Sequence, residues 1–193
     1  MKRTAVIFPG IGYTCKRPLL YYTAAMAEEH GYDVIRLDYG EDIHSMKCRD
    51  LETMNGVAAQ GVERALPQLT GIDWNACGDI LMISKSVGTV IAVRTARQLG
   101  IAERARHFMI TPIPATLPYL KDMNGVFVSG TGDPYIDREQ VLQAAAENPD
   151  KALRIFDDCN HSLERKGHTL ENLGNLEEVV RLLEKQLRQS EGE

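Results

Sequence analysis

Short apolar runs alternate with longer stretches of helical spacing along the chain, and this alternation constrains the fold more than any other feature of the sequence. Six runs rich in branched apolar residues are expected to be strands, at residues 4–8, 33–38, 80–84, 107–111, 125–129 and 153–156. Helices are expected at residues 17–30, 49–66, 87–99, 137–147 and 174–189. Because each run is nearly continuous in apolar character, both faces of each strand should be covered. The pattern predicts a doubly wound α/β fold, a mostly parallel sheet of about six strands flanked by helices.

Length and charge narrow the class of protein. A chain of 193 residues suits one domain spanning residues 1–193. Its net charge of −5 gives no general basic field, so neither nucleic acid nor an anionic membrane is an expected partner. The first apolar run ends at Pro9 and is too short for a signal peptide or a membrane span, so a cytoplasmic protein is expected. The four cysteines are scattered without metal-binding spacing, and we expect free thiols and no metal site.

The stretch MISKSVGT contains a candidate nucleophile. Ligands of parallel sheets bind beyond the carboxyl ends of the strands, so a functional residue should directly follow a strand. Ser86 does so, and the small residues Ser84 and Gly88 flank it at the spacing of a nucleophile elbow, G-x-S-x-G, although glycine is commoner at the first position. Centred on Ser84, the motif would place Met82 where only a small side chain fits. Ser86 could equally be a helix N-cap, and the motif alone leaves both interpretations open.

A serine nucleophile needs a base, and His161 is the best placed histidine. It follows the last expected strand by a few residues, at the edge of the sheet where Ser86 must lie. The other four histidines are less well placed. His30 fits a helix end, and His44 precedes the serine in the chain. His107 lies at the opposite edge of the sheet, and His168 lies in a charged loop.

The orienting acid is expected after a strand, between the serine and the histidine in chain order. Asp133 meets both conditions, since it follows the expected strand 125–129 and a short glycine turn. Asp133 and Pro134 could instead mark only a turn. Asp137 is a competitor for the same role, but it fits better as the N-cap of the next helix.

Two backbone amides are expected to stabilise the negative charge that develops on a substrate carbonyl. One is the amide of Val87, directly after the nucleophile and at a helix N-terminus. The other should come from the loop FPGIGYT after the first strand, where Ile11 is the first choice and Gly12 the second. This loop matches neither a dinucleotide-binding fingerprint nor a Walker loop.

The glycine loop, Ser86, Asp133 and His161 follow one another along the chain in this order. With these motifs in this order, the sequence resembles the α/β-hydrolase superfamily over essentially the whole chain. The resemblance is to the small lidless members, including dienelactone-hydrolase-like proteins. It implies a serine hydrolase without a cofactor, acting through an acyl-enzyme, in which His161 takes the proton of Ser86 and Asp133 orients the imidazole. Two features depart from the family. Many members carry His-Gly where this chain has Pro9 and Gly10, and dienelactone hydrolases proper use a cysteine nucleophile.

The segment PIPATLPYLKDMN, between two expected strands, is too short for a cap domain. Ile113, Leu117 and Tyr119 could form an apolar wall beside Ser86, and with Tyr13 they are the expected substrate-binding residues; a packed surface loop is the alternative. An open site of this kind predicts a small-molecule ester or thioester as substrate. Two alternatives are a ligand-binding or scaffold protein with little or no catalytic activity, and hydrolysis of an amide or a carbon–carbon bond.

Lys85 and two cysteines lie next to these predicted loops. The residue before an elbow nucleophile points away from the substrate, so Lys85 is expected to reach packing or solvent beside the sheet and to form an ion pair. Cys15 and Cys159 are expected to be incidental thiols, with modulation of activity by oxidation as the alternative.

Overall fold

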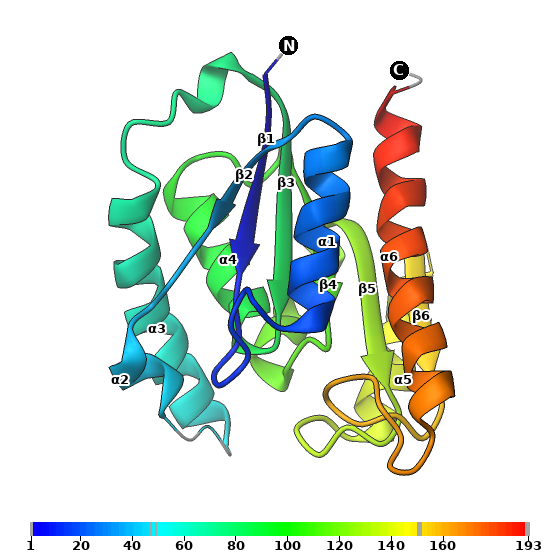
Figure 1. Cartoon of the computed structure of the whole chain (residues 1–193). Coiled ribbons are helices and arrows are strands. Elements are labelled where there is room, and N and C mark those ends of the chain that lie inside the picture. Colours follow the sequence, from blue (N-terminus) through cyan, green and yellow to red (C-terminus); the bar gives the residue numbers. More distant parts are fainter. Residues whose placement is uncertain (1, 47, 49, 150–151, 192–193) are drawn as a thin grey trace.

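The computed structural model describes residues 2–46, 48, 50–149 and 152–191, and a six-stranded sheet forms its centre (Figure 1). The strands are β1 (Lys2–Phe8), β2 (Asp33–Arg36), β3 (Cys77–Lys85), β4 (Ala105–Ile110), β5 (Asn124–Gly130) and β6 (Ala152–Phe156). They lie in the order β2-β1-β3-β4-β5-β6, and every neighbouring pair is parallel. The predicted parallel sheet of six strands is confirmed.

The strand ends differ from the expected ones by up to three residues: β3 begins at Cys77 rather than at residue 80, and β2 ends early. This strand was expected to continue to Asp38 but ends at Arg36. The carboxylate of Asp38 accepts a hydrogen bond from the amide of Gly40, 2.9 Å away, and this turn directs the chain away from the sheet. The polar residue therefore ends the strand rather than extending it.

The helices are α1 (Pro18–Glu29), α2 (Glu41–His44), α3 (Leu51–Gln68), α4 (Val87–Gln98), α5 (Arg138–Glu147) and α6 (Thr169–Glu191), with short 3₁₀ helices η1 (Trp74–Ala76) and η2 (Pro114–Asp122). The five expected helices are present, whereas α2, η1 and η2 were not predicted. Arg49, the expected start of the helix 49–66, lies outside the described residues; Asp50 caps α3 by accepting from the amide of Thr53 at 2.8 Å. Within the described ranges, no helix is long and apolar enough to cross a membrane.

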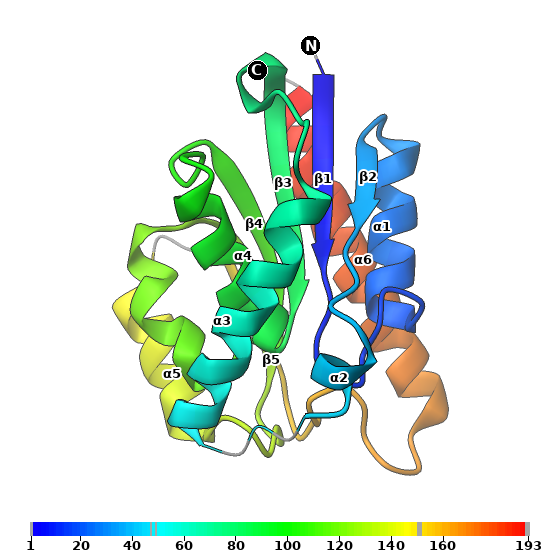
Figure 2. The ribbon, with the colours of Figure 1, turned by 90° about the vertical axis from the view of Figure 1, so that its left-hand side faces the viewer.

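Helices cover both faces of the sheet, as the apolar runs predicted. Figure 2 shows α3, α4 and α5 on one side of the strands and α1 and α6 on the other. Alternate side chains of β1 enter the two cores: Ala5 and Ile7 pack in the cluster formed with α1 and α6, and Val6 and Phe8 pack in the cluster formed with α3 and α4.

Because all strands run parallel, their carboxyl ends meet at one edge of the sheet. The loops that leave β1, β3, β4, β5 and β6 at this edge carry, in turn, Ile11, Ser86, Ile113, Asp133 and His161. Residues far apart in the sequence are thereby collected in one region, where ligands of such sheets bind.

Candidate active site

The turn between β3 and α4 has the geometry expected of an elbow. Ser86 lies between the two elements with φ 56° and ψ −129°, a conformation that residues with a side chain rarely adopt. A Cβ added to Gly88 would lie 2.3 Å from the carbonyl oxygen of Phe8, so the small residue is required by the backbone after β1. Ser86 occupies the N-cap position of α4, but its hydroxyl makes no capping hydrogen bond to the helix, so the side chain does not act as a cap.

A short hydrogen bond joins the predicted acid and base. Nδ1 of His161 lies 2.6 Å from Oδ2 of Asp133, whose side chain is completely buried. Oδ1 of the same carboxylate accepts from the amide of Tyr135 at 2.9 Å. Both carboxylate oxygens therefore have partners, and the carboxyl group is fixed relative to the imidazole.

This arrangement determines which nitrogen of His161 is free. An ionised carboxylate only accepts hydrogen bonds, so Nδ1 carries the proton and Nε2 of the neutral ring keeps a lone pair. Nε2 is buried and has no hydrogen-bond partner among the described residues. Burial lowers the pKa of His161, and the ammonium of Lys85 lowers it further, while the hydrogen bond to Asp133 acts in the opposite direction. In its neutral form the imidazole can therefore accept a proton at Nε2.

Backbone hydrogen bonds fix the two loops that carry these residues to each other. The amide of Thr131 donates to the carbonyl of Phe156 at 3.0 Å, and the amide of Gly132 donates to the carbonyl of Cys159 at 2.9 Å. In the reverse direction, the amide of Asp158 donates to the Thr131 hydroxyl at 2.8 Å. These contacts hold the loop after β5 against the loop after β6. The relative position of Asp133 and His161 therefore does not depend on their mutual hydrogen bond alone.

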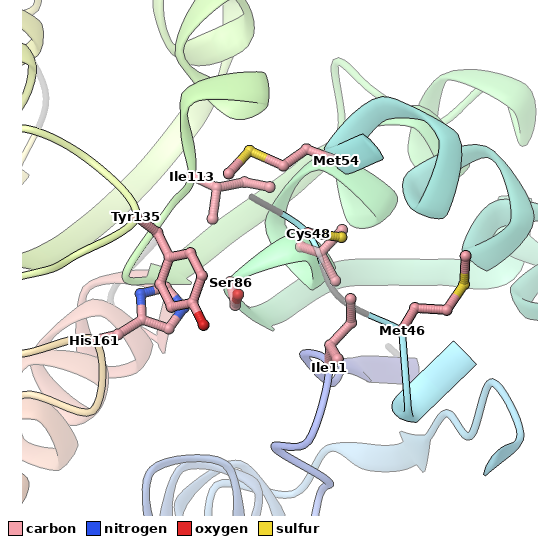
Figure 3. A pocket seen from close by; sticks show the side chains of 9 residues that line it. Ile11, Met46, Cys48, Met54, Ser86, Ile113, Tyr135 and His161 are labelled. Carbon is pink, nitrogen blue, oxygen red and sulfur yellow. The ribbon is translucent and has the colours of Figure 1, made fainter. Parts of the chain in front are cut away.

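Ser86 and His161 line one pocket, seen from close by in Figure 3. Its volume is about 320 Å³, enough for a small ligand. The ring of Tyr135 lies beside the imidazole of His161, with 4.7 Å between the ring centroids. The other lining residues are apolar or weakly polar: Ile11, Met46, Cys48, Met54, Val87 and Ile113.

Ile11 and Val87, two of the expected oxyanion donors, line this pocket. Their role as donors to an oxyanion stays a prediction. Gly10 and Tyr13 exchange backbone hydrogen bonds of 3.1 and 3.4 Å across a tight turn, in which Gly12 has a φ of 63°. Ile11 lies within this turn and lines the pocket. The amide of Val87 is the first of α4 and has no acceptor within the helix.

Of the expected substrate-binding residues, only Ile113 lines this pocket. The ring of Tyr13 lies against the ammonium of Lys85, and its hydroxyl accepts from the amide of Leu19 at 3.1 Å, so it points behind the pocket. Leu117 and Tyr119 lie in η2, where they pack against the core between α4 and α5. The segment after β4 is therefore a packed 3₁₀ helix over most of its length, and it contributes one residue to the wall.

Four lining residues were not predicted: Met46, Cys48, Met54 and Tyr135. Tyr135 follows the predicted acid by two residues, and its position in that loop was the only available signal. Met46 and Cys48 precede α3, and Met54 lies in its first turn, so only the packing of α3 brings them to the site.

Two further expectations concern Lys85 and the cysteines. Lys85 does not reach solvent, and its ammonium forms no ion pair with a described carboxylate; it donates to a carbonyl and a hydroxyl instead. All four cysteines are free thiols, as expected. Burial raises the pKa of Cys15 to about 11 and also raises that of Cys159, which makes both thiols less reactive at neutral pH.

Comparisons with known proteins place the fold. No family model matches the sequence, and no curated protein matches it. The structure is similar to that of an α/β-hydrolase candidate of unknown function from Agrobacterium tumefaciens, with a TM-score of 0.71 and 17% identity over 100% of this chain and 87% of that one. It is also similar to Est1E from Butyrivibrio proteoclasticus, with a TM-score of 0.70 and 10% identity over 100% and 89% of the two chains.

A third similar structure is the serine hydrolase without a lid, XC6422, from Xanthomonas campestris, with a TM-score of 0.56 and 16% identity over 92% of this chain and 80% of that one. The chain therefore has the fold of the small α/β hydrolases that lack a cap. At these identities the likeness concerns the fold, and the chemistry depends on the residues of the site.

Proposed function

We propose that this protein is a serine hydrolase that cleaves a small ester or thioester through an acyl-enzyme. One observation carries the proposal: the hydrogen bond between Asp133 and His161 leaves a buried, unpartnered Nε2 on a residue that shares its pocket with Ser86. The resemblance of the fold to serine hydrolases supports the same class of reaction.

In the first step, the Ser86 hydroxyl attacks the substrate carbonyl and its proton passes to Nε2 of His161. The carbonyl electron pair moves onto oxygen, where the amides of Ile11 and Val87 stabilise the negative charge. Collapse of this intermediate expels the alcohol or thiol, which takes the proton from Nε2. In the second step, Nε2 of His161 takes a proton from water, which attacks the acyl-enzyme. The acid is released, and the proton on Nε2 returns to the oxygen of Ser86. Asp133 keeps the imidazole in the required tautomer throughout.

The lining of the pocket favours an uncharged acyl group. Apart from Ser86 and His161, the lining residues are mainly aliphatic, sulfur-containing or aromatic, and no lysine or arginine occurs among the described residues that line it. A carboxylate or phosphate placed there would lose its hydration without gaining a charged partner. Est1E has been solved with ferulic acid bound, so aromatic acyl esters belong in the substrate panel beside short aliphatic ones.

The test measures hydrolysis of p-nitrophenyl esters and acyl-CoAs of increasing chain length. Asp133→Asn is expected to lower turnover by about 10⁴-fold and Ser86→Ala by about 10⁶-fold, from the losses seen in serine proteases. His161→Ala should be comparable to Ser86→Ala. Ser84→Ala and Asp137→Asn are the matched controls, because Ser84 lies two residues away in β3 and Asp137 stands at the N-cap of α5, where asparagine also caps. Wild-type turnover in Ser86→Ala would contradict the proposal, and no turnover of any substrate by the wild type would favour a binding protein.

A further inference from the structure

A lysine side chain is almost wholly buried beside the candidate site. Lys85 is the last residue of β3, directly precedes Ser86 and is 1% exposed. Burying an ammonium costs free energy unless other groups replace its water. An apolar side chain could fill the same space without that cost. The contacts that Lys85 makes therefore indicate what its charge is used for.

The Lys85 ammonium reaches three segments of the sheet edge. Nζ donates to the carbonyl oxygen of His161 at 2.9 Å and to the hydroxyl of Thr111 at 3.2 Å. It also lies 4.4 Å from the ring centroid of Tyr13, a cation–π contact. Tyr13, Thr111 and His161 follow β1, β4 and β6, so this one side chain connects three loops around the site.

His161 is consequently held at two atoms. Lys85 binds its carbonyl oxygen at 2.9 Å, and Asp133 binds Nδ1 of its imidazole at 2.6 Å. The only other polar atom of the side chain, Nε2, has no hydrogen-bond partner in the described part of the chain. With both the backbone and the ring plane restrained, the direction of the Nε2 lone pair is fixed.

We propose that Lys85 is a positioning residue: its ammonium fixes the backbone of His161 so that the free Nε2 is directed at the Ser86 hydroxyl. This proposal rests on the proposed function, because the direction of Nε2 matters for turnover only if Ser86 is the nucleophile. Lys85 takes no proton from Ser86 and does not touch the substrate.

The electrostatics agree with this geometry. Burial lowers the pKa of Lys85 to about 7, and the negative charge of Asp133 opposes that shift. Burial raises the pKa of Tyr13 to about 12, so the ring beneath the ammonium stays a neutral phenol. The positive charge of Lys85 in turn lowers the pKa of His161. Below about pH 7 the same group both holds His161 and favours its neutral, basic form; above it, the neutral amine can still donate to the carbonyl.

Other contacts of the loop indicate that Lys85 can be replaced without unfolding the chain. Oδ1 of Asn160 accepts from the amides of Ser162 and Glu164 at 2.8 and 3.2 Å, and the amide of Leu163 donates to the Asn160 carbonyl at 2.8 Å. The loop therefore keeps its local turn when the ammonium is removed. What it loses is its attachment to β3.

The test compares three variants by steady-state kinetics over a range of pH. Lys85→Met removes the donor and the charge at similar side-chain volume, whereas Lys85→Gln removes the charge but keeps a donor. Lys121→Met, at an exposed position of η2, removes the same charge far from these contacts and is the control.

In Lys85→Met, kcat is expected to fall by about 10–100-fold with little change in KM, because a base displaced by about 1 Å loses that much rate. The acid limb of the pH profile should also move to higher pH, since the ammonium no longer lowers the pKa of His161. Lys85→Gln should retain more of kcat and show the same shift of the limb. Lys121→Met should match the wild type in both measurements.

A loss of activity with an unmoved acid limb would show a merely structural role and overturn the proposal, as would wild-type kcat in Lys85→Met. If Lys85→Met does not fold, Lys85→Gln carries the same comparison of the acid limb. A titration of His161 followed by NMR can be measured even if the protein has no activity. The resonance of His161 is assigned by its absence from the spectrum of His161→Ala. An inactive wild type whose His161 midpoint rises in Lys85→Met would refute the proposed function alone; an active wild type whose midpoint is unchanged by that substitution would refute the role of Lys85 alone.

Discussion

Ser86 has a backbone conformation, φ 56° and ψ −129°, that glycine adopts far more readily than any residue with a Cβ. Two substitutions separate this strain from the loss of the hydroxyl. Ser86→Ala keeps the Cβ and the strain, whereas Ser86→Gly removes both the side chain and the steric cost. Because both variants lack the nucleophile, any difference in their stability reports the backbone at the elbow.

The size of the difference follows from two opposing contributions. A residue held in such a region costs about 1–3 kcal/mol, which glycine recovers. Glycine in turn loses about 0.5–1 kcal/mol because its unfolded chain has more freedom. The balance is about 1 kcal/mol in favour of Ser86→Gly. For a chain of this length, that corresponds to a rise in Tm of about 2–4 °C.

Thermal and urea unfolding of the two variants, followed by circular dichroism, measure this difference. We expect Ser86→Gly to unfold at higher temperature than Ser86→Ala, while ester hydrolysis is lost in both. A Ser86→Gly variant less stable than Ser86→Ala would show that Ser86 is not strained, and it would remove the geometric basis of the elbow.

Two further predictions concern crowding and pH. Gly88→Ala should destabilise the fold by about 3 kcal/mol in urea unfolding, because the new Cβ would overlap the carbonyl of Phe8. Gly174→Ala, on an exposed and open turn of α6, should instead stabilise it by about 0.5–1 kcal/mol, and equal effects would contradict the packing at the elbow. Because burial lowers the pKa of His161, kcat/KM should rise with pH to a plateau with a midpoint below about 6.5; a midpoint above that value would mean that the imidazole is not desolvated as described.

The sheet and its candidate site could be predicted because both depend on local patterns in a known order. A buried parallel strand must be apolar almost throughout, and the residue after it must lie at the carboxyl edge. These two rules are enough to bring Ser86, Asp133 and His161 to the same edge. The need for a small residue at position 88 was also predictable, and the neighbour that imposes it is the carbonyl of Phe8.

Contacts made by long side chains could not be predicted in this way. Tyr13 was expected to contact the substrate, and Lys85 to reach packing or solvent beside the sheet and to form an ion pair. Lys85 is packed, as one of these expectations had it, but it contacts the Tyr13 ring behind the pocket and not a carboxylate. The residues next to Tyr13 and Lys85 in the sequence do not indicate in which direction these long side chains point. Met54 lines the pocket only because α3 packs across α4, and that packing depends on residues far away in the chain.

The most direct test of a Ser86 nucleophile is the site of labelling by a fluorophosphonate probe, determined by mass spectrometry of the digested protein. The wild type and Ser84→Ala should each carry one phosphonyl group on Ser86, and Ser86→Ala should carry none. Labelling of Ser86→Ala to the same extent as the wild type, or a wild type that does not react, would contradict the assignment of Ser86 as the nucleophile.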